Sequence, residues 1–418
     1  MNTQVPAGGS IFSWRRLRWW LLVAGIALVV NALGIMQPQL LKTLGVHPIN
    51  PPFADLIAIL AAGETHAAGL NAYANNPLDP LNRPHVYGPW WLVIGQFGAV
   101  RADAWWLGLL LAGSFLAVVV GVLNPRNVRT TLMSLVWLAS PPVLLALERG
   151  NNDLVIFILF AIAVWLVTRP APVAPILAGG LLVLAAALKL YPLVALPALA
   201  SRPVARSRAW WMLGGTAAIC IIVLLSALAD YQRTLTMAPE PFTIFGYGAK
   251  LSHHLLQTLP QQRGWVLAGG LPVILFTLWA SWRWWRSFWT LLPTTGLTTG
   301  CYLAGALSWS LCYVTTINFP YRLVLLLLPA RLWLEYESTG RINGAIRFQW
   351  LVTSLLLWTP CFKEHLLVPN ADESRYTGTA ATWMALGVEH ALAFAITGTL
   401  GVMALGWMWR RFANPTAT

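Results

Sequence analysis

The sequence has few charged residues, and acidic side chains are especially scarce. Only 10% of its 418 residues are Asp, Glu, Lys or Arg, and Asp and Glu together number 14. Soluble domains carry roughly 25% charge, so this composition excludes an ordinary soluble protein. Hydrophobic residues make up 57% of the chain instead. The long apolar runs that they form predict an all-α integral membrane protein.

Cysteine is also rare. The chain has four, Cys220, Cys301, Cys312 and Cys361, all in or beside apolar runs. They form no Cys-x-x-Cys motif and pair with no histidine in the sequence, which disfavours a metal site or a disulfide framework. We therefore interpret them as small buried apolar residues, and we expect neither a metal ion nor a cofactor.

Cations outnumber anions by 27 to 14. The arginines form short clusters between apolar runs, an arrangement that orients a polytopic protein by keeping the clusters in the cytoplasm. No basic face is long enough to follow a phosphate backbone, so nucleic acid is not an expected partner. Arg15, Arg16 and Arg18 precede an apolar run without a small-residue cleavage site, which predicts a retained signal anchor in the plasma (inner) membrane.

The alternation of apolar runs and arginine clusters predicts about twelve membrane segments, with both termini cytoplasmic. Residues 1–418 would form a single polytopic membrane domain. Its extracytoplasmic loops would cover about residues 37–103, 230–263 and 363–380. Two of the predicted segments run from about Thr131 to Leu147 and from Phe288 to about Thr315.

The apolar stretch from Gly88 to Val100 allows two interpretations. Counted as a full span, it would place Arg126 and Arg129 outside the cell, against the positive-inside rule. We therefore expect an interfacial or re-entrant helix. A second interfacial helix is predicted at Ala54–Ala68, before a Pro/Asn-rich stretch that no regular helix tolerates.

Polar residues collect on the predicted outward side. Ionisable groups at membrane depth are costly and usually face a cavity, so this clustering predicts a functional site. The candidate residues are Asp55, the Glu148–Asp153 turn (Glu-Arg-Gly-Asn-Asn-Asp), Lys189, His253, His254 and Arg322.

An acid beside cations and amides suits group transfer to a hydroxyl from a phosphate-activated donor. The carboxylate would accept the hydroxyl proton as a general base. Lys and Arg would stabilise the charge that builds on the leaving phosphate. Amides such as Asn151 and Asn152 could bind sugar hydroxyls, and aromatic side chains would line the lipid and sugar faces.

Each candidate also has a purely structural interpretation. Asp55 could cap the helix that begins beside it. Glu148 and Arg149 could form an exposed ion pair of little energetic value. Lys189 could extend its ammonium group to the interface. His253 and His254 could be ordinary loop residues, since no acid lies near them in the sequence to complete a metal site.

Several short motifs occur together in one order along the chain. An early Asp55 is followed by Gly69 and Tyr73, then by Tyr87-Gly88-Pro89 at the start of an apolar helix. The Leu147–Asp153 turn, Lys189-Leu190-Tyr191-Pro192 and Tyr321-Arg322-Leu323 complete the set. In this order they resemble the C-type glycosyltransferase superfamily (GT-C). The similarity is strongest to its polyprenyl-phosphate-mannose-dependent mannosyltransferases, which include the enzymes that build phosphatidylinositol mannosides.

The resemblance implies a GT-C fold and a metal-independent, inverting sugar transfer on the periplasmic side of the membrane. A polyprenyl-phosphate-linked sugar, with mannose inherited from the family, would be the donor, and a lipid or glycan the acceptor. Asp55 would be the catalytic base. We assign donor phosphate binding to Lys189, Arg322, His253 and His254. Sugar or acceptor binding is assigned to Glu148, Asn151, Asn152, Asp153, Tyr87, Tyr191 and Tyr321.

Two other functions fit the same pattern in part. A lipid or sugar transporter or flippase would also gather polar groups near a cavity, but it would predict inverted repeats, and the sequence has no clear repeat. An undecaprenyl-diphosphate glycan polymerase or ligase would favour a large late periplasmic loop. The late loop here, Lys363 to Tyr376, is modest.

Overall fold

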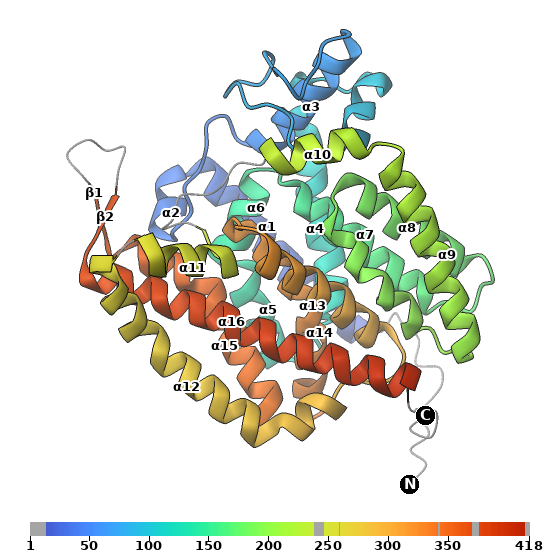
Figure 1. Cartoon of the computed structure of the whole chain (residues 1–418), viewed down its shortest axis with the longest axis vertical. Helices are drawn as coiled ribbons and strands as arrows, with labels where there is room; N and C mark the ends of the chain where they lie inside the picture. Colours follow the sequence, from blue (N-terminus) through green and yellow to red (C-terminus); the bar gives the residue numbers. More distant parts are fainter. Residues whose placement is uncertain (1–13, 238–245, 259, 342, 370–375, 414–418) are drawn as a thin grey trace.

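The computed structural model describes residues 14–237, 246–258, 260–341, 343–369 and 376–413. These residues are almost entirely helical, as the composition predicts (Figure 1). The exception is a short antiparallel hairpin, β1 (Leu367–Pro369) and β2 (Tyr376–Gly378), in the third predicted extracytoplasmic loop.

The helices follow one another in four groups along the chain. The first group is α1 (Trp14–Met36), α2 (Pro38–Thr43), α3 (Ala54–Ala67), η1 (Pro89–Phe97), η2 (Arg101–Asp103) and α4 (Ala104–Leu123). The second is α5 (Val128–Leu138), α6 (Pro141–Glu148), α7 (Asn152–Val167), α8 (Ala174–Leu188) and η3 (Tyr191–Ser201). The third is α9 (Arg206–Leu225), α10 (Leu228–Met237), α11 (Ala249–Thr258) and α12 (Pro260–Thr290). The last is α13 (Leu297–Thr315), η4 (Pro320–Leu326), α14 (Leu327–Ser338), α15 (Gly344–Glu364), α16 (Ala380–Met408) and η5 (Trp409–Ala413).

Four stretches of the described residues are long and apolar enough to cross a membrane: Arg101–Leu123, Arg206–Leu225, Gln261–Thr290 and Ala380–Ala413. The bent pair α5 and α6 would make a fifth if it forms one span. A helical membrane protein is therefore supported. The count of about twelve segments, the single-domain division and the cytoplasmic termini stay predictions.

Two predicted continuous segments are wrong because proline interrupts them. The segment Thr131–Leu147 is divided into α5 and α6, which meet at an angle of 56°. Pro141 and Pro142 have no N–H to donate, so they fit only the first turn of a new helix. The segment Phe288–Thr315 is likewise divided, since α12 ends at Thr290 and α13 begins at Leu297.

The stretch from Gly88 to Val100 is too short to cross a bilayer. Its helix η1 has nine residues, which at roughly 2 Å per residue in a 3₁₀-helix reach much less than the ~30 Å hydrocarbon thickness. It packs instead on α3, where the backbones of Gly63 and Gly95 meet: a Cβ added to Gly95 would lie 2.2 Å from the Gly63 carbonyl oxygen. This close contact sets the position of the helix that carries Asp55.

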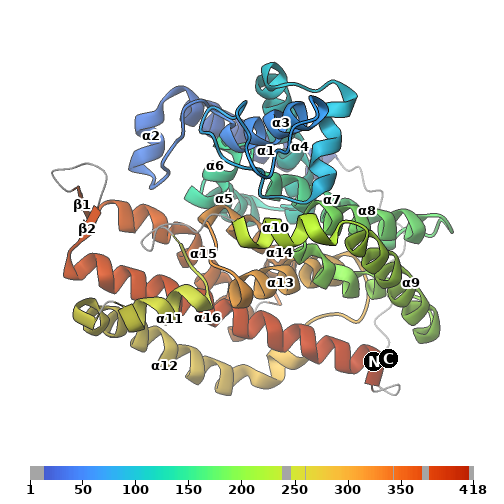
Figure 2. The same ribbon diagram turned by 45° about the horizontal axis from the view of Figure 1, so that its top comes forward.

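The core contains large tryptophan side chains as well as aliphatic ones. Trp137, Trp309 and Trp333 are at most 1% exposed, and each donates its indole N–H to a polar side chain on another helix. Buried tryptophan usually needs such a partner. The long helices α12 and α16 pack side by side below this core, as Figure 2 shows.

We predict that Gly95→Ala destabilises the protein by about 1–3 kcal/mol, the usual effect of overpacking, because the new methyl group would clash with the backbone of α3. Thermal unfolding in detergent would measure the change. Gly113→Ala on α4 is the matched control, since a Cβ there meets nothing within 4 Å. Equal unfolding of the two variants would contradict the proposed role of the contact.

Candidate active site

The N-terminus of α3 is held by the turn that follows α6. The backbone N–H of Phe53 donates to the Glu148 carbonyl at 2.7 Å, and that of Asp55 donates to the Arg149 carbonyl at 3.0 Å. The first N–H groups of a helix have no partner within the helix, so these two carbonyls act as its cap. The first loop and the polar turn are thereby joined through the backbone.

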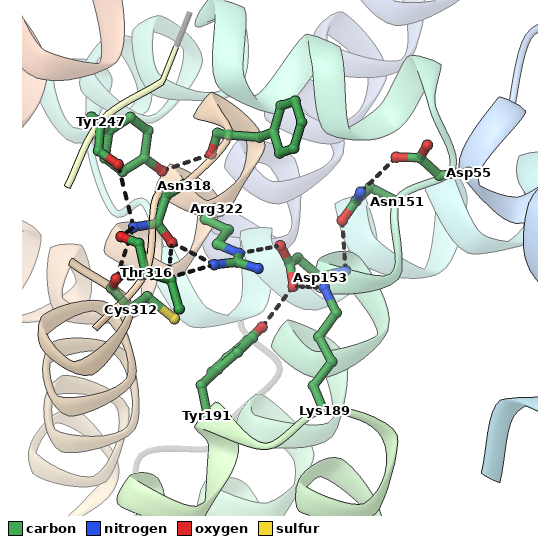
Figure 3. A network of polar contacts seen from close by, with 11 residues as sticks. Asp55, Asn151, Asp153, Lys189, Tyr191, Tyr247, Cys312, Thr316, Asn318 and Arg322 are labelled. Carbon is green, nitrogen blue, oxygen red and sulfur yellow. Dashed lines mark hydrogen bonds and ion pairs between the residues drawn. The ribbon is translucent and has the colours of Figure 1, made fainter. Parts of the chain in front are cut away.

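Asp55 lies at this junction and is 5% exposed. Its Oδ2 accepts a hydrogen bond from Asn151 Nδ2 at 2.7 Å, and its Oδ1 accepts one from Arg83 Nη1 at 3.1 Å. The interpretation of Asp55 as a helix cap is wrong, because the cap residue of α3 is Phe53 and no side chain caps this end. The carboxylate points instead at the polar turn, as Figure 3 shows.

Arg83 is a residue of this site that the sequence reasoning missed. Besides Asp55 it contacts Asp79, through Nε and Nη2, and the carbonyl of Ala54. Burial acts to lower the pKa of Arg83, but the hydrogen bond and charge of Asp79 and the charge of Asp55 raise it overall, so the guanidinium stays charged. The sequence feature that could have identified Arg83 is its isolation, because it is the one Lys or Arg between Phe53 and Val100.

A second cluster is centred on Asp153, a fully buried residue in the first turn of α7. Asp153 Oδ1 accepts hydrogen bonds from Lys189 Nζ and, at 2.7 Å, from the Tyr191 hydroxyl. Arg322 Nε lies 3.8 Å from Oδ2 (Figure 3). Lys189 is 8% exposed, so it does not reach out to the interface but is paired inside the bundle.

Arg322 is positioned from its other side by residues that were not predicted. Its Nη1 donates to Thr316 Oγ1 at 3.1 Å and to Asn318 Oδ1. Asn318 in turn donates to the Cys312 carbonyl and exchanges backbone hydrogen bonds with Tyr247. Asn318 could have been found from its place in the Asn-Phe-Pro-Tyr-Arg turn, whereas nothing near Tyr247 in the sequence indicates this contact.

Lys189 and Arg322 line a cavity of about 260 Å³. The predicted aromatic residues Tyr87, Tyr191 and Tyr321 also line it. Lys189 Nζ lies 5.3 Å from the ring centre of Tyr87. A cavity with two cations and aromatic walls suits an anion attached to a sugar or an apolar chain.

The first loop reaches this cavity through Gly88. Its N–H donates to the Leu188 carbonyl at 3.3 Å, and a Cβ at this position would lie 2.3 Å from the Ala187 carbonyl oxygen. Glycine is therefore required for the loop to approach the end of α8 so closely. The contact places Tyr87 beside Lys189.

Of the other residues of the polar turn, Glu148 and Asn152 are buried and Arg149 is half-buried, and the alternative interpretation of Glu148 and Arg149 as an ion pair has no support. Glu148 Oε1 accepts from the Ile49 N–H at 3.0 Å, and no salt bridge joins Glu148 to Arg149 among the described residues. The Asn152 amide has no hydrogen-bond partner within the described part of the chain. Arg149 lines a separate cavity of about 400 Å³. Phe319 lines both this cavity and the cavity of Lys189 and Arg322.

The two predicted histidines are not brought into this cluster. His253 and His254 lie on α11 with exposed side chains, and neither lines the cavity of Lys189 and Arg322. Their assignment to phosphate binding has no geometric support. Asp55, Asn151, Asp153, Lys189, Tyr191 and Arg322, in contrast, form one connected polar network.

Comparison with protein families gave a match. A protein-family model described as Glycosyltransferase family 87 matches residues 87–309, more than half of the 418-residue chain. The matched region includes the polar turn, Lys189 and Tyr191, whereas Asp55 and Arg322 lie outside it. No curated protein and no solved structure matches the chain.

We predict that Asp153→Asn destabilises the protein by roughly 3–5 kcal/mol, because it leaves the buried Lys189 and the half-buried Arg322 without their carboxylate. Thermal or denaturant unfolding in detergent would measure the loss. Asp230→Asn is the matched control, since the Asp230–Arg233 pair is partly exposed and such pairs contribute about 0–1 kcal/mol. Similar losses in both variants would show that the Asp153 cluster is not a buried ion pair.

His85 predicts a pH dependence of stability. Its ring is 3% exposed, packs against Tyr73 and Tyr87, and contacts the Gly88 carbonyl; burial lowers its pKa to about 4. The unfolded chain, with an ordinary histidine pKa of about 6.5, therefore binds a proton first as the pH falls. The contribution of the neutral His85 to the stability of the folded protein is therefore complete above about pH 6.5. It is lost as the pH falls toward 4, at up to about 1.4 kcal/mol per pH unit.

Unfolding measured at pH 7 and pH 5 would test this dependence. The stability difference between the two pH values should shrink by about 2 kcal/mol in His85→Phe, and it should stay unchanged in His253→Gln, whose histidine is exposed. An unchanged difference in His85→Phe would mean that His85 does not titrate in this range.

Proposed function

Because the chain belongs to glycosyltransferase family 87 and is a membrane glycosyltransferase, we propose that it transfers a sugar from a polyprenyl-phosphate donor to a hydroxyl of a lipid or glycan acceptor. Asp55 is the general base in this proposal. Lys189 and Arg322 bind the donor phosphate. Mannose is the first sugar to test, and the periplasmic face is the proposed side.

The reaction is a displacement at the anomeric carbon. The acceptor hydroxyl oxygen forms a bond to this carbon while the bond to the phosphate oxygen breaks. The hydroxyl proton goes to the Asp55 carboxylate, and polyprenyl phosphate leaves with the bonding electron pair. A single displacement inverts the anomeric configuration. A positioned base of this kind contributes typically 10²–10⁴-fold to the rate.

The observation that carries the proposal is the connection between the base and the cations. Asn151 donates to Asp55 through its amide nitrogen, and its amide oxygen accepts the Asp153 backbone N–H at 2.9 Å. Asp153 holds Lys189 and contacts Arg322. A turn of three residues therefore joins the proton acceptor to the two groups that would meet the leaving phosphate.

The charge of the cluster fits a phosphate that gains charge during reaction. Two cations against one Asp153 carboxylate leave a net charge of about +1, which matches the single charge of the donor phosphodiester. The leaving phosphate monoester carries more negative charge, so the cations stabilise the transition state more than the bound donor. The tyrosines of the same cavity would contact the sugar, as aromatic residues do in many carbohydrate sites.

The second cavity is a candidate for the acceptor. It is lined by the Arg149 side chain, and the backbone carbonyl of the same residue accepts from the Asp55 N–H. An acceptor bound there would lie next to the donor cavity, because Phe319 lines both cavities.

We predict that the purified protein, reconstituted in lipid, transfers radiolabelled mannose from polyprenyl-phosphate mannose to a membrane lipid extract. Asp55→Asn should lower the rate at least 100-fold, because the amide cannot accept the proton, while donor binding persists. Glu64→Gln, a change of another acid on α3 that contacts Arg101 instead, should keep its activity.

Each other outcome has a definite meaning. Equal transfer by wild type and Asp55→Asn would remove Asp55 from the chemistry and keep the enzyme class. If wild type fails with mannose and with a panel of other polyprenyl-phosphate sugars, the polyprenyl-phosphate donor is wrong. Movement of a labelled lipid across the bilayer without transfer would favour the flippase.

A further inference from the structure

A second cationic cavity lies at the other end of the helices that carry the candidate active site. Its volume is about 430 Å³, and Arg126, Arg169 and Arg331 line it together with Trp20 and Trp165. No Asp or Glu is among its lining residues. It therefore has the charge of an anion site, although the proposed glycosyl transfer makes no use of it.

The helices α7 and α13 separate the two regions. α7 begins at Asn152 in the polar turn and ends at Val167, two residues before Arg169. Its 16 residues extend about 24 Å at 1.5 Å per residue. α13 runs the other way, from Leu297 at this cavity to Thr315 at the donor cavity. The arginine cavity thus lies at the opposite end of the bundle, on the side that the positive-inside rule predicts to be cytoplasmic.

One of the three arginines, Arg331, has a structural role. Arg331 Nη1 donates to the Val122 carbonyl at 2.8 Å, and its Nε donates to Thr298. It therefore satisfies a carbonyl of the last turn of α4, where cations are favoured. This contact accounts for Arg331 without any ligand.

Two residues that line the cavity each carry a donor with no such explanation. Arg169 Nε and Trp20 Nε1 are buried, and neither finds a hydrogen-bond partner among the described residues. The Arg169 guanidinium stacks on Trp165, 4.1 Å from the ring centre, which holds it in place. Buried donors without a partner are costly, and both would be satisfied by the same kind of ligand, an acceptor with several oxygens.

The surroundings distinguish a lipid from a free anion. Ile162 and Trp165, which also line the cavity, are 37% and 45% exposed, on a helix of otherwise apolar sequence. They would lie against acyl chains. Basic pockets between membrane helices on the cytoplasmic side bind anionic head groups.

We propose that this cavity binds the phosphate head group of an anionic phospholipid, with Arg169 and Trp20 as donors to the phosphate oxygens. Arg126 contributes further positive charge, and the acyl chains lie along Ile162 and Trp165. The bound lipid bridges the ends of α4 and α7.

The full-length protein, purified in detergent and stripped of lipid, should bind phosphatidylglycerol more tightly than phosphatidylcholine, as measured by native mass spectrometry. Arg169→Gln should weaken phosphatidylglycerol binding about tenfold, the effect of losing one charge-assisted hydrogen bond. Arg208→Gln is the matched control. It removes the same charge from the exposed start of α9, outside the cavity, and should bind like wild type.

Trp20→Phe provides a second variant that removes only the indole N–H and should also weaken binding. Three results would overturn the proposal: equal affinity for the two lipids, unchanged phosphatidylglycerol binding in both Arg169→Gln and Trp20→Phe, or full displacement of the lipid by millimolar inorganic phosphate. The last result would assign the cavity to a free anion instead.

Discussion

The buried carboxylate of Asp153 is the group on which the organisation of this protein depends. An ammonium and a guanidinium cannot be placed together inside an apolar bundle unless an anion compensates them. Asp153 does so for Lys189 and Arg322, which come from the end of α8 and from η4. One side chain at the start of α7 thereby connects three parts of the bundle that are far apart in sequence.

The proposed base is built on a different principle. Asp55 is held by neutral and charged donors on separate elements, Asn151 from the polar turn and Arg83 from the first loop. Both carboxylate oxygens are engaged, so the orientation of the group is determined before a substrate arrives. Such preorganisation lowers the reorganisation required during reaction.

Much of this arrangement could be predicted from the sequence. Asp55, Asn151, Asp153, Lys189 and Arg322 were identified because polar residues are rare and costly in so apolar a chain, and they do meet. The breaks within Thr131–Leu147 and Phe288–Thr315 were missed, since hydropathy averages over a proline that ends a helix. Arg83 and Tyr247 were missed because their partners depend on how distant segments pack. His253 and His254 were included because their loop was predicted to face outward with the other polar residues, and the packing leaves them exposed.

The cap on α3 has a consequence for how this site could diversify. The helix that carries Asp55 is held through the carbonyl oxygens of residues 148 and 149, and every amino acid supplies a carbonyl oxygen. These two hydrogen bonds therefore do not depend on which side chains stand at positions 148 and 149. A protein built in this way can change the chemistry of the polar turn at these two positions while the backbone of the helix that carries Asp55 keeps both hydrogen bonds.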